Sequence, residues 1–395
     1  MEPSRRAVLT GALAVAPAVL LTAGPAHAAA AAVGRPVVQD VQRQLATRYG
    51  ARPGFPSVNT DGRWTGDTQR ALIHALQLEV GLAETVANGS FGPLTRAKLK
   101  ELPDLVEGSV DTTGFLGHLL QAALVAMTTW DGPVDGRFSS AQAARLRAFQ
   151  DSVGLARTGR GDFATWSSLL ASNGDPTRPG TAADGIAVIT LARARVLRDA
   201  GYEVVGRYLT DSDRPDALAK RIQDGELESI LAGGLRVFPI FQEGGTDTTY
   251  FSYDLGVRAA ARADDAARRL GFLPGTTIYF AVDFDATPDQ VERLVQPHFR
   301  GIRAELARRG SAYAVGVYGG RQVCTTLSAA HLADLSFVAG MSTGWLSNLG
   351  VRMPGNWAFD QVQELSMGPG ETGFDIDKGI VSGRDPGQSR IQPTT

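Results

Sequence analysis

Apolar and polar positions follow two different patterns along this chain, and the change between them divides it in two. Between residues 37 and 172 the apolar residues recur at intervals of three and four, which predicts amphipathic helices. Between residues 182 and 388, short apolar runs are followed by longer Ala-, Arg- and Leu-rich stretches, which predicts alternating strands and helices. The segment Ser172 to Ala183 is rich in Gly, Pro, Thr and Asn, so we interpret it as a linker.

The first half repeats one pattern. An Asp-Gly turn occurs at Asp61 and again at Asp135, which is an offset of 135 − 61 = 74 residues. A helical glutamine occurs at Gln77 and again at Gln150, which is an offset of 150 − 77 = 73 residues. Self-similarity at this period indicates one small unit used twice. The predicted units, each of three short helices, span residues 37–103 and 104–172.

Both units resemble the peptidoglycan-binding-like module in their Asp-Gly turns and helical spacing. That resemblance implies a three-helix bundle that holds cell-wall glycan or its stem peptide in a shallow groove. Thr95 and Thr165 are predicted to cap the last helix of each unit. His74 and His118 have no partners at metal-ligand spacing, so we expect surface or half-buried side chains there.

The second half alternates strands with helices. The predicted strands are Gly185–Val188, Glu203–Leu209, Leu235–Phe241, Thr277–Asp283, Tyr313–Tyr318, Ser336–Gly340, Ala358–Gln363 and Phe374–Ile380. The clearest predicted helices are Leu191–Ala200, Ala217–Leu231, Leu255–Leu270, Asp289–Arg309 and Arg321–Leu332. This order predicts an α/β fold, a (β/α)₈ TIM-like barrel preceded by two small all-α three-helix modules. An open doubly wound sheet that bound a dinucleotide would need a glycine-rich loop after its first strand, and the sequence has none.

The segment Thr277–Asp285 ends in two carboxylates. Its large apolar residues occupy alternate positions, so we expect them to face the outer helices. Small residues, such as Ala281 here and Gly316 in the next strand, are expected to face the barrel interior. Asp283 and Asp285 are two residues apart, which puts them on one side of an extended chain, roughly 6.6 Å apart. Glycosidases use carboxyl pairs separated by about 5 to 9.5 Å. Capping of the following helix is the structural alternative.

Polar residues gather where the predicted strands end, and barrel enzymes carry their active sites at that rim. The predicted rim residues are Arg207, Tyr208, Gln242, Asp283, Asp285, Tyr318, Asp360, Gln361, Asp375 and Asp377. Trp345 and Trp357 occur in the late loops, where their rings are predicted to stack on sugar faces. These residue types together predict a carbohydrate-binding site.

Six strings in residues 182–388 carry a family resemblance. They are GYEVVGRYL (201–209), IYFAVDFD (278–285), GVYG (316–319), MSTGW (341–345), WAFDQ (357–361) and DKGIVSG (377–383). They resemble the glycoside-hydrolase-like domain family of unknown function that is similar to lysozyme-type muramidases. The resemblance implies a modified TIM barrel and a cell-wall role.

The same resemblance assigns roles to individual residues. The early strand aspartate of the muramidases falls on Asp184, their Asp-x-Glu strand end on Asp283 and Asp285, and their late aspartate on Asp375 or Asp377. Asp285 stands where a glutamate is expected as the general acid, and its side chain is one methylene shorter. Because catalytic geometry is sensitive to displacements of about 1 Å, hydrolysis and binding without cleavage both remain open.

Composition and the N-terminus narrow the setting. The chain has 395 residues and a formal net charge of −2, and this charge argues against nucleic acid as a partner. Its one cysteine, Cys324, excludes an intramolecular disulfide framework. Paired arginines at Arg5 and Arg6, an apolar run and Ala26-His27-Ala28 predict a twin-arginine signal peptide over residues 1–28. The run is too short and too interrupted to anchor the mature chain in a membrane.

Two hypotheses follow. In the first, the protein is a secreted, cell-wall glycoside hydrolase in which Asp283 and Asp285 are catalytic and no metal or cofactor takes part. In the second, it binds peptidoglycan or a related glycan without cleaving it, and the helical modules add avidity. A Ser-His-Asp esterase is disfavoured because the sequence has no nucleophile elbow. In both hypotheses the other predicted substrate contacts are Asp184, Arg207, Tyr208, Gln242, Tyr318, Trp345, Trp357, Asp360, Gln361, Asp375 and Asp377.

Overall fold

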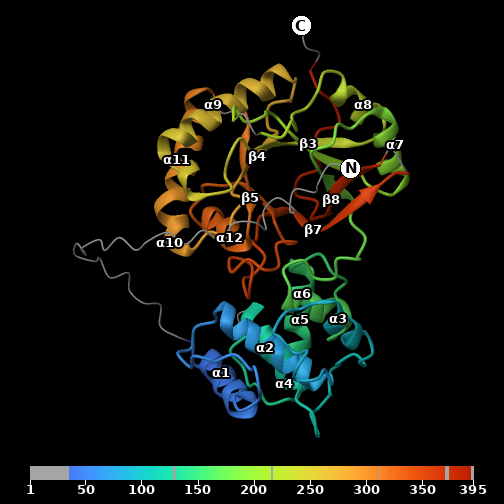
Figure 1. The fold of residues 1–395 in the computed structure, drawn as a ribbon, viewed down its shortest axis with the longest axis vertical. Coiled ribbons are helices and arrows are strands. Elements are labelled where there is room, and N and C mark those ends of the chain that lie inside the picture. The colour runs from blue at the N-terminus through green and yellow to red at the C-terminus, as the bar shows by residue number, and fades with distance from the viewer. Residues whose placement is uncertain (1–34, 128–129, 215–216, 311, 370–372, 393–395) are drawn as a thin grey trace, which may run out of the picture.

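The protein consists of a helical domain and a barrel domain that pack against each other (Figure 1). The computed structural model describes residues 35–127, 130–214, 217–310, 312–369 and 373–392. The predicted signal peptide, residues 1–28, lies outside the described residues. None of the described helices combines the length and the apolar character needed to cross a membrane.

Six of the described helices form the helical domain. They are α1 (Pro36–Tyr49), α2 (Gly66–Glu79), α3 (Pro93–Lys100), α4 (Leu116–Met127), α5 (Ser140–Ser152) and α6 (Phe163–Leu170). Helix α4 is apolar on nearly every side because it occupies the centre, where ten of its twelve residues are buried. Leu72 and Leu76 of the first unit and Leu120 and Leu124 of the second belong to one continuous hydrophobic cluster. The two units therefore share a single core.

The internal repeat is visible in buried glutamines that hold equivalent turns. Gln42 accepts a hydrogen bond from the backbone N–H of Gly62 at 2.8 Å, and Gln121 accepts one from Gly136 at 2.8 Å. Both glycines have positive φ, 77° and 72°, which other residues rarely adopt. These bonds satisfy buried polar groups in the same way in both units, so the Asp-Gly turns are part of each unit's core.

A second pair of glutamines corrects the predicted caps. Gln77 donates to the Thr95 hydroxyl at 2.9 Å, and Gln150 donates to the Thr165 hydroxyl at 2.8 Å. Both threonines lie inside their helices, α3 and α6, and the N-cap of α6 is Asp162. The prediction that Thr95 and Thr165 cap these helices was wrong, because their hydroxyls bind buried glutamines instead.

Eight strands close into a barrel in chain order. They are β1 (Ala182–Asp184), β2 (Val204–Tyr208), β3 (Arg236–Phe241), β4 (Thr277–Ala281), β5 (Ala314–Gly319), β6 (Leu335–Val338), β7 (Trp357–Met367) and β8 (Phe374–Val381). This confirms the predicted barrel. Strands β1 to β7 pair in parallel, whereas β8 is antiparallel to both β7 and β1. The first strand was predicted at Gly185–Val188 and lies earlier, where its backbone pairs with β2.

Helices cover the barrel between β1 and β6. They are α7 (Leu191–Asp199), α8 (Glu226–Ala232), α9 (Tyr253–Arg269), α10 (Pro288–Gln290), α11 (Gln296–Arg308) and α12 (Arg321–Ala329), with a 3₁₀ turn at Thr248–Tyr250 and a π-helical turn at Val291–Val295. The predicted helix Ala217–Leu231 begins only at Glu226. Asp211 explains this, because its carboxylate accepts the backbone N–H groups of Lys220 and Arg221 and keeps the preceding segment out of a helix.

The two faces of the barrel strands carry different side chains. Ile278, Phe280 and Val282 belong to the cluster beneath the outer helices, as predicted. The interior is filled largely by aromatic rings, among them Tyr279, and Phe238 stacks on Phe359 with ring centroids 4.1 Å apart. Gly316 does leave room for Tyr279, since a Cβ there would lie 2.6 Å from the ring. The expectation that mainly small residues face inward was wrong.

The helical domain covers strands that have no helix of their own. Below the barrel in Figure 1, α5 and α6 lie near β7. Trp357, at the start of β7, is 3% exposed and donates to the backbone carbonyl of Ser152 at 2.9 Å. Because β7 runs parallel to β6, this start lies at the end of the barrel opposite the rim. The prediction that Trp357 stacks on sugar was therefore wrong.

Asp360 also belongs to the contact between the domains. Its carboxylate lies 3.4 Å from the Arg178 guanidinium of the linker, and the guanidinium of Arg321 binds the backbone carbonyl of Ser172. Burial raises the pKa of Asp360 to about 6, although the charges of Arg321 and Arg178 oppose that shift. Asp360 faces away from the barrel interior and cannot contact sugar at the rim, contrary to the prediction.

A buried ion pair fixes α8 to β2. The Arg207 guanidinium binds the Glu226 carboxylate at 2.6 Å, also donates to the carbonyl of Gly185, and is fully buried. Its neighbours Val205 and Leu209 lie in the cluster beneath the helices, so Arg207 points outward. The prediction that it positions sugar was wrong, because this side chain joins secondary-structure elements.

Arg207→Met is expected to lower the free energy of unfolding by about 3 to 5 kcal/mol, because Glu226 would stay buried without its counter-charge. Chemical denaturation at pH 7.5 measures the loss. Arg236→Met is the matched control, since that strand residue pairs with Glu203 at the surface and should change stability by less than about 1 kcal/mol. Equal losses in the two variants would contradict the proposed role.

The pKa of Asp360 predicts a pH dependence of stability. Because the folded-state pKa, about 6, exceeds the ordinary value of 3.8, folding holds this proton more tightly. The resulting stabilisation is present below about pH 4 and is lost as pH rises through 6. Over that window the free energy of unfolding of the wild type should fall by about 3 kcal/mol relative to Asp360→Asn. Parallel pH profiles for the two proteins would refute this.

Candidate functional site

Polar side chains converge at the carboxyl end of the barrel strands. Gln361 of β7 lies at the centre, and its amide nitrogen donates to Asp184 of β1 at 2.9 Å and to Asp377 of β8 at 2.9 Å. Its carbonyl oxygen accepts a hydrogen bond from the Tyr318 hydroxyl of β5 at 2.9 Å. One glutamine thus joins three other strands, and this geometry brings three of the predicted rim residues together with Asp184, another predicted substrate contact.

A second chain of hydrogen bonds lies on the β3 and β4 side of the rim. Gln242, directly after β3, donates to Asp283 at 2.9 Å and accepts from the Lys220 ammonium at 2.9 Å. The Lys220 ammonium also lies 4.4 Å from the centre of the Tyr208 ring, which is a cation–π distance. The backbone N–H of Asp283 binds the carbonyl of Gly245, which fixes where this carboxylate leaves the strand.

The carboxylates of both chains of hydrogen bonds act electrostatically on Tyr318. Burial raises the pKa of its hydroxyl, and the negative charges of Asp283, Asp184 and Asp377 raise it further. The phenol therefore stays protonated and donates its hydrogen to Gln361. We call the set of Asp184, Tyr208, Lys220, Gln242, Asp283, Tyr318, Gln361 and Asp377 the rim cluster.

Exposure separates the floor of the rim cluster from its contact surface. Asp184, Gln361 and Tyr208 are buried, at 3%, 2% and 3% exposure, so they form the floor. Asp283 and Asp377 are only half-buried, which lets a ligand reach them. Strands β4 and β8 stand four apart in a closed barrel of eight, on opposite sides of the opening. A ligand over the barrel axis would lie between two carboxylates.

Asp285 has a different partner. Its two carboxylate oxygens accept the backbone N–H groups of Leu346 at 2.7 Å and Ser347 at 2.9 Å. These residues belong to the loop between β6 and β7, which also carries the half-buried Trp345. Asp285 therefore positions this loop, and its predicted role as the general acid stays a prediction.

The strand register distinguishes Asp375 from Asp377, the two residues to which the family pattern could assign its late aspartate. Asp377 pairs with Asp184 across β8 and β1, inside the closed part of the barrel. Asp375 pairs with Ser366 on the part of the β7–β8 hairpin that extends past β1, and it is exposed. Its carboxylate binds the Ser366 hydroxyl at 2.6 Å. Asp377 therefore belongs to the rim cluster, and Asp375 lies beyond it.

Sequence reasoning missed Lys220 and Glu226. Both fall in the stretch that was predicted as one continuous helix, where a charged residue indicates only a solvated face. The sequence does contain a signal for this, the preceding segment Thr210-Asp211-Ser212-Asp213. Asp and Ser side chains bind nearby backbone groups and favour turns, so this segment indicates an irregular stretch before the helix. Lys220 is the one cation of the rim cluster. The site predicted from the sequence therefore lacked the positive charge that accompanies its carboxylates.

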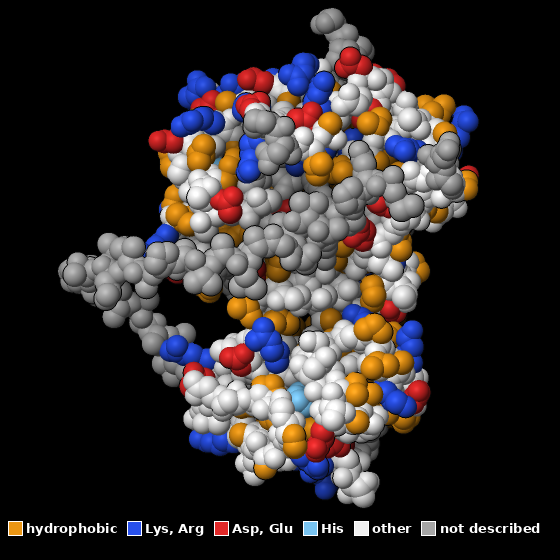
Figure 2. Space-filling view, viewed as in Figure 1, with side chains coloured by type: hydrophobic (Ala, Val, Ile, Leu, Met, Phe, Trp, Pro, Cys, Tyr) orange, Lys and Arg blue, Asp and Glu red, His pale blue; other side chains and the backbone are white. Residues whose placement is uncertain are grey.

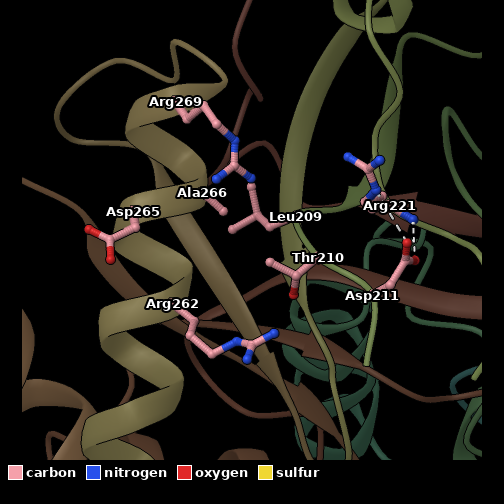
Figure 3. Close-up of a pocket in the computed structure, with 8 residues that line it drawn as sticks. All are labelled: Leu209, Thr210, Asp211, Arg221, Arg262, Asp265, Ala266 and Arg269. Carbon is pink, nitrogen blue, oxygen red and sulfur yellow. Dashed lines mark hydrogen bonds and ion pairs between the residues drawn. The ribbon is translucent and has the colours of Figure 1, made fainter. Parts of the chain in front are cut away.

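A hollow of about 360 Å³ lies outside the barrel, between α9 and the segment after β2 (Figure 3). Arg262 and Arg269 extend from α9 toward Thr210, while Asp265 points away. Arg262 pairs with Asp213 and Glu243, and Arg221 pairs with Asp211. Most of the charged side chains that line the hollow are thus already paired with one another or with nearby residues. The hollow shares no lining residue with the rim cluster, so we do not place the functional site in it.

Within the described residues, no three His, Cys, Asp or Glu side chains are grouped so that they could hold a metal ion. Asp184 and Asp377 instead share the amide of Gln361. On the face shown in Figure 2, acidic and basic side chains are interspersed over the barrel. The chemistry that the rim cluster offers is hydrogen bonding: carboxylates and amides for hydroxyl groups, and tyrosine rings for stacking.

Two family models match separate parts of this chain. Residues 195–381 match the model described as Rv2525c-like, glycoside hydrolase-like domain. Residues 31–170 match the model described as FadG/YbfG, PGDB-like domain. The first match includes every residue of the rim cluster except Asp184.

Similar proteins extend over most of the chain. It is 44% identical to the uncharacterized protein FadG of Bacillus subtilis over 355 residues, which cover 90% of this chain and 61% of FadG. It is 41% identical to the uncharacterized protein YbfG of the same organism over 364 residues, which cover 90% of this chain and 49% of YbfG. The chain thus spans between about half and three fifths of these relatives.

A crystal structure of the Tat-secreted protein Rv2525c of Mycobacterium tuberculosis aligns with 53% of this chain and 99% of its own, at 20% identity and a TM-score of 0.43. The family models make the barrel similar to Rv2525c-like, glycoside hydrolase-like domains and the helical domain similar to the FadG/YbfG, PGDB-like domain. The glycoside hydrolase-like match supports a glycan-related role.

Proposed function

We propose that the barrel binds a cell-wall glycan, such as peptidoglycan, across the rim cluster. The observation that carries this proposal is the convergence of Asp283, Asp377 and Tyr318 around one opening, above a floor of buried polar groups. Half-buried carboxylates are strong acceptors for sugar hydroxyls, because hydrogen bonds to charged groups exceed those between neutral groups. The glycoside hydrolase-like match over residues 195–381 points to the same ligand class.

Trp345 completes the proposed site. Its indole lies on the loop that Asp285 holds by two backbone bonds, next to the carboxyl end of β5, where Gln322 binds the Ser347 carbonyl at 2.9 Å. A half-buried tryptophan on a braced loop is suited to stacking on a sugar ring, since little side-chain freedom is lost on binding. We propose that Trp345 is this stacking residue.

Hydrolysis is the second candidate function. It is favoured by the position of Asp283 and Asp377 on opposite sides of the opening, which would place carboxylates on both sides of a glycosidic bond. In this scheme one of the two donates a proton to the leaving oxygen and the other acts on the opposite face of the sugar. In this scheme Asp285 positions the loop, because both of its oxygens accept backbone N–H groups from it.

The setting we propose is outside the cytoplasmic membrane. The paired Arg5 and Arg6, followed by an apolar run and small residues, support export through the twin-arginine route. The helical domain would then hold the protein on the cell wall, as the PGDB-like match over residues 31–170 suggests. Two binding surfaces on one chain raise the overall affinity for a polymer without any new contact.

Asp283→Asn and Asp377→Asn are each expected to weaken binding to purified sacculi by roughly 10- to 100-fold, because each removes a charged acceptor. Sedimentation with sacculi measures binding, and release of reducing ends over long incubation measures hydrolysis. Glu203→Gln is the control, since that exposed carboxylate pairs with Arg236 where β2 and β3 begin, at the end of the barrel opposite the rim, and should bind as the wild type does. Unchanged binding in both rim variants would refute the proposed site.

Asp285→Ala is expected to lower the free energy of unfolding by about 1 to 3 kcal/mol and to weaken glycan binding in parallel, because the Leu346 and Ser347 amides lose their acceptor. Asp285→Asn keeps one acceptor oxygen, so smaller losses of both kinds are expected. Denaturation and sacculus binding are compared for the same preparations. An Asn variant as stable as the wild type that no longer releases reducing ends would instead make Asp285 the proton donor.

A further inference from the structure

The loop between β6 and β7, residues 339–356, touches the rim of the barrel with one part and the helical domain with another. At the rim, Asp285 accepts the backbone N–H groups of Leu346 and Ser347 at 2.7 Å and 2.9 Å. Trp345, the proposed stacking residue, directly precedes these two amides in the chain. Whatever holds the loop in place therefore also holds one side of the proposed glycan site.

Two residues next to the start of α2, Trp64 and Gly66, touch this loop from the helical domain. A Cβ on Gly66 would lie 3.1 Å from the Leu346 side chain, and a Cβ on Gly350 would lie 2.6 Å from the Trp64 indole. Gly350 has a φ of 68°, a backbone conformation that favours glycine. Met353, later in the loop, packs against the hydrophobic clusters of both domains. The Trp64 indole thus lies directly against the loop backbone.

The indole of Trp64 is held in one orientation by the core of the helical domain. Its Nε1 donates to the side-chain oxygen of Gln69 at 3.0 Å, and the Gln69 amide donates to the backbone carbonyl of Leu170 at 3.2 Å. Gln69 lies in α2 of the first unit and is fully buried, whereas Leu170 ends α6 of the second unit. Both repeated units therefore fix the surface that Trp64 presents to the loop.

Hydrogen bonds brace the loop on both sides of the Trp64 contact. The buried side chain of Asn348 accepts the backbone N–H of Arg321 at 2.8 Å and donates to the carbonyl of Ser342 at 3.0 Å. The buried guanidinium of Arg321 donates to the carbonyl of Val351 at 2.9 Å. Because closely packed segments transmit strain, a displacement at Gly350 also moves the part of the loop at the rim.

We infer that Trp64 is a positioning residue for the rim site. By holding residues 339–356 from the helical domain, it keeps Trp345 and the amides that bind Asp285 in the arrangement that accepts glycan. A stacking residue that is already in place loses less freedom on binding. Because coupling between two sites is reciprocal, glycan at the rim in turn stabilises the contact between the domains. This inference rests on the proposed function of the rim cluster.

Hydrogen exchange of the full chain, without glycan, tests the positioning itself. Trp64→Ala should speed exchange of the Leu346 and Ser347 amides by about tenfold or more, because the loop then opens more easily. Arg96→Ala is the matched control, since Arg96 also joins the helical domain to the rest of the chain but binds the linker and not the loop. It should change these two rates by less than about twofold. Equal rates in Trp64→Ala and the wild type would overturn the inference.

Gly350→Ala is the second variant, for the case that Trp64→Ala does not fold. It changes no residue of the helical domain, and its methyl group would meet the indole at 2.6 Å and push the loop away. Gly383→Ala is its control, because Gly383 has a similar φ of 84° but nothing lies within 4 Å of the added carbon. Faster exchange at Leu346 and Ser347 is expected only for Gly350→Ala, and equal exchange in both glycine variants would contradict it.

Binding to purified sacculi tests whether Trp64 acts through Trp345. Trp64→Ala should weaken binding by about three- to tenfold, but by less than about twofold in a chain that already carries Trp345→Ala, because the ring to be positioned is then missing. Trp64→Phe keeps an aromatic ring against Gly350 and should restore most of the affinity. The same loss with and without Trp345 would show that Trp64 acts elsewhere, and the inference would be wrong.

Failure of the proposed function gives a different result. If the rim does not bind glycan, Asp283→Asn and Asp377→Asn leave sacculus binding unchanged, whereas exchange of the Leu346 and Ser347 amides still responds to Trp64→Ala. Exchange measured without glycan therefore separates positioning of the loop from glycan binding by the rim.

Discussion

The outer face of an eight-stranded barrel has to be covered, and in this protein the described residues between β6 and the end of β8 form no helix that could cover it. Within the part of the chain that the structure describes, no helix separates β6, β7 and β8, and β8 returns antiparallel as half of a hairpin with β7. The helical domain supplies the missing cover. Trp357 contacts the end of α5, and Asp360 meets the linker arginine Arg178. The two domains therefore depend on each other for burial of apolar surface.

This dependence also places the functional surfaces. The helical domain packs against the side of the barrel and leaves the rim cluster accessible at the carboxyl ends of the strands. The loop between β6 and β7 reaches from the rim, where Asp285 binds it, to the helical domain, where a Cβ on Gly66 would lie 3.1 Å from Leu346. One loop thus contacts both the rim of the barrel and the helical domain.

Much of the fold could be predicted from the sequence because local signals carried it. The repeat, the helix periods and the eight apolar runs are properties of neighbouring residues, and the closed barrel that they predict is confirmed. The errors in the fold have nonlocal causes. Asp211 binds backbone groups nine and ten residues later and removes half of a predicted helix, and Gln77 binds Thr95 across a turn. Such contacts do not change the spacing of apolar residues in the sequence, so periodicity cannot predict them.

The sequence by itself determined that polar residues end the barrel strands, and which residues those are. It did not determine which way each one faces. Arg207 and Tyr208 are adjacent, as are Asp360 and Gln361, and adjacent strand residues point to opposite sides. Only closure of the barrel placed Tyr208 and Gln361 on its inner face. Arg207 and Asp360 lie on the outer face, where they form buried ion pairs with Glu226 and Arg178. The same closure brought Asp184, Asp283 and Asp377 together, because strands far apart in sequence become neighbours only when the sheet is closed.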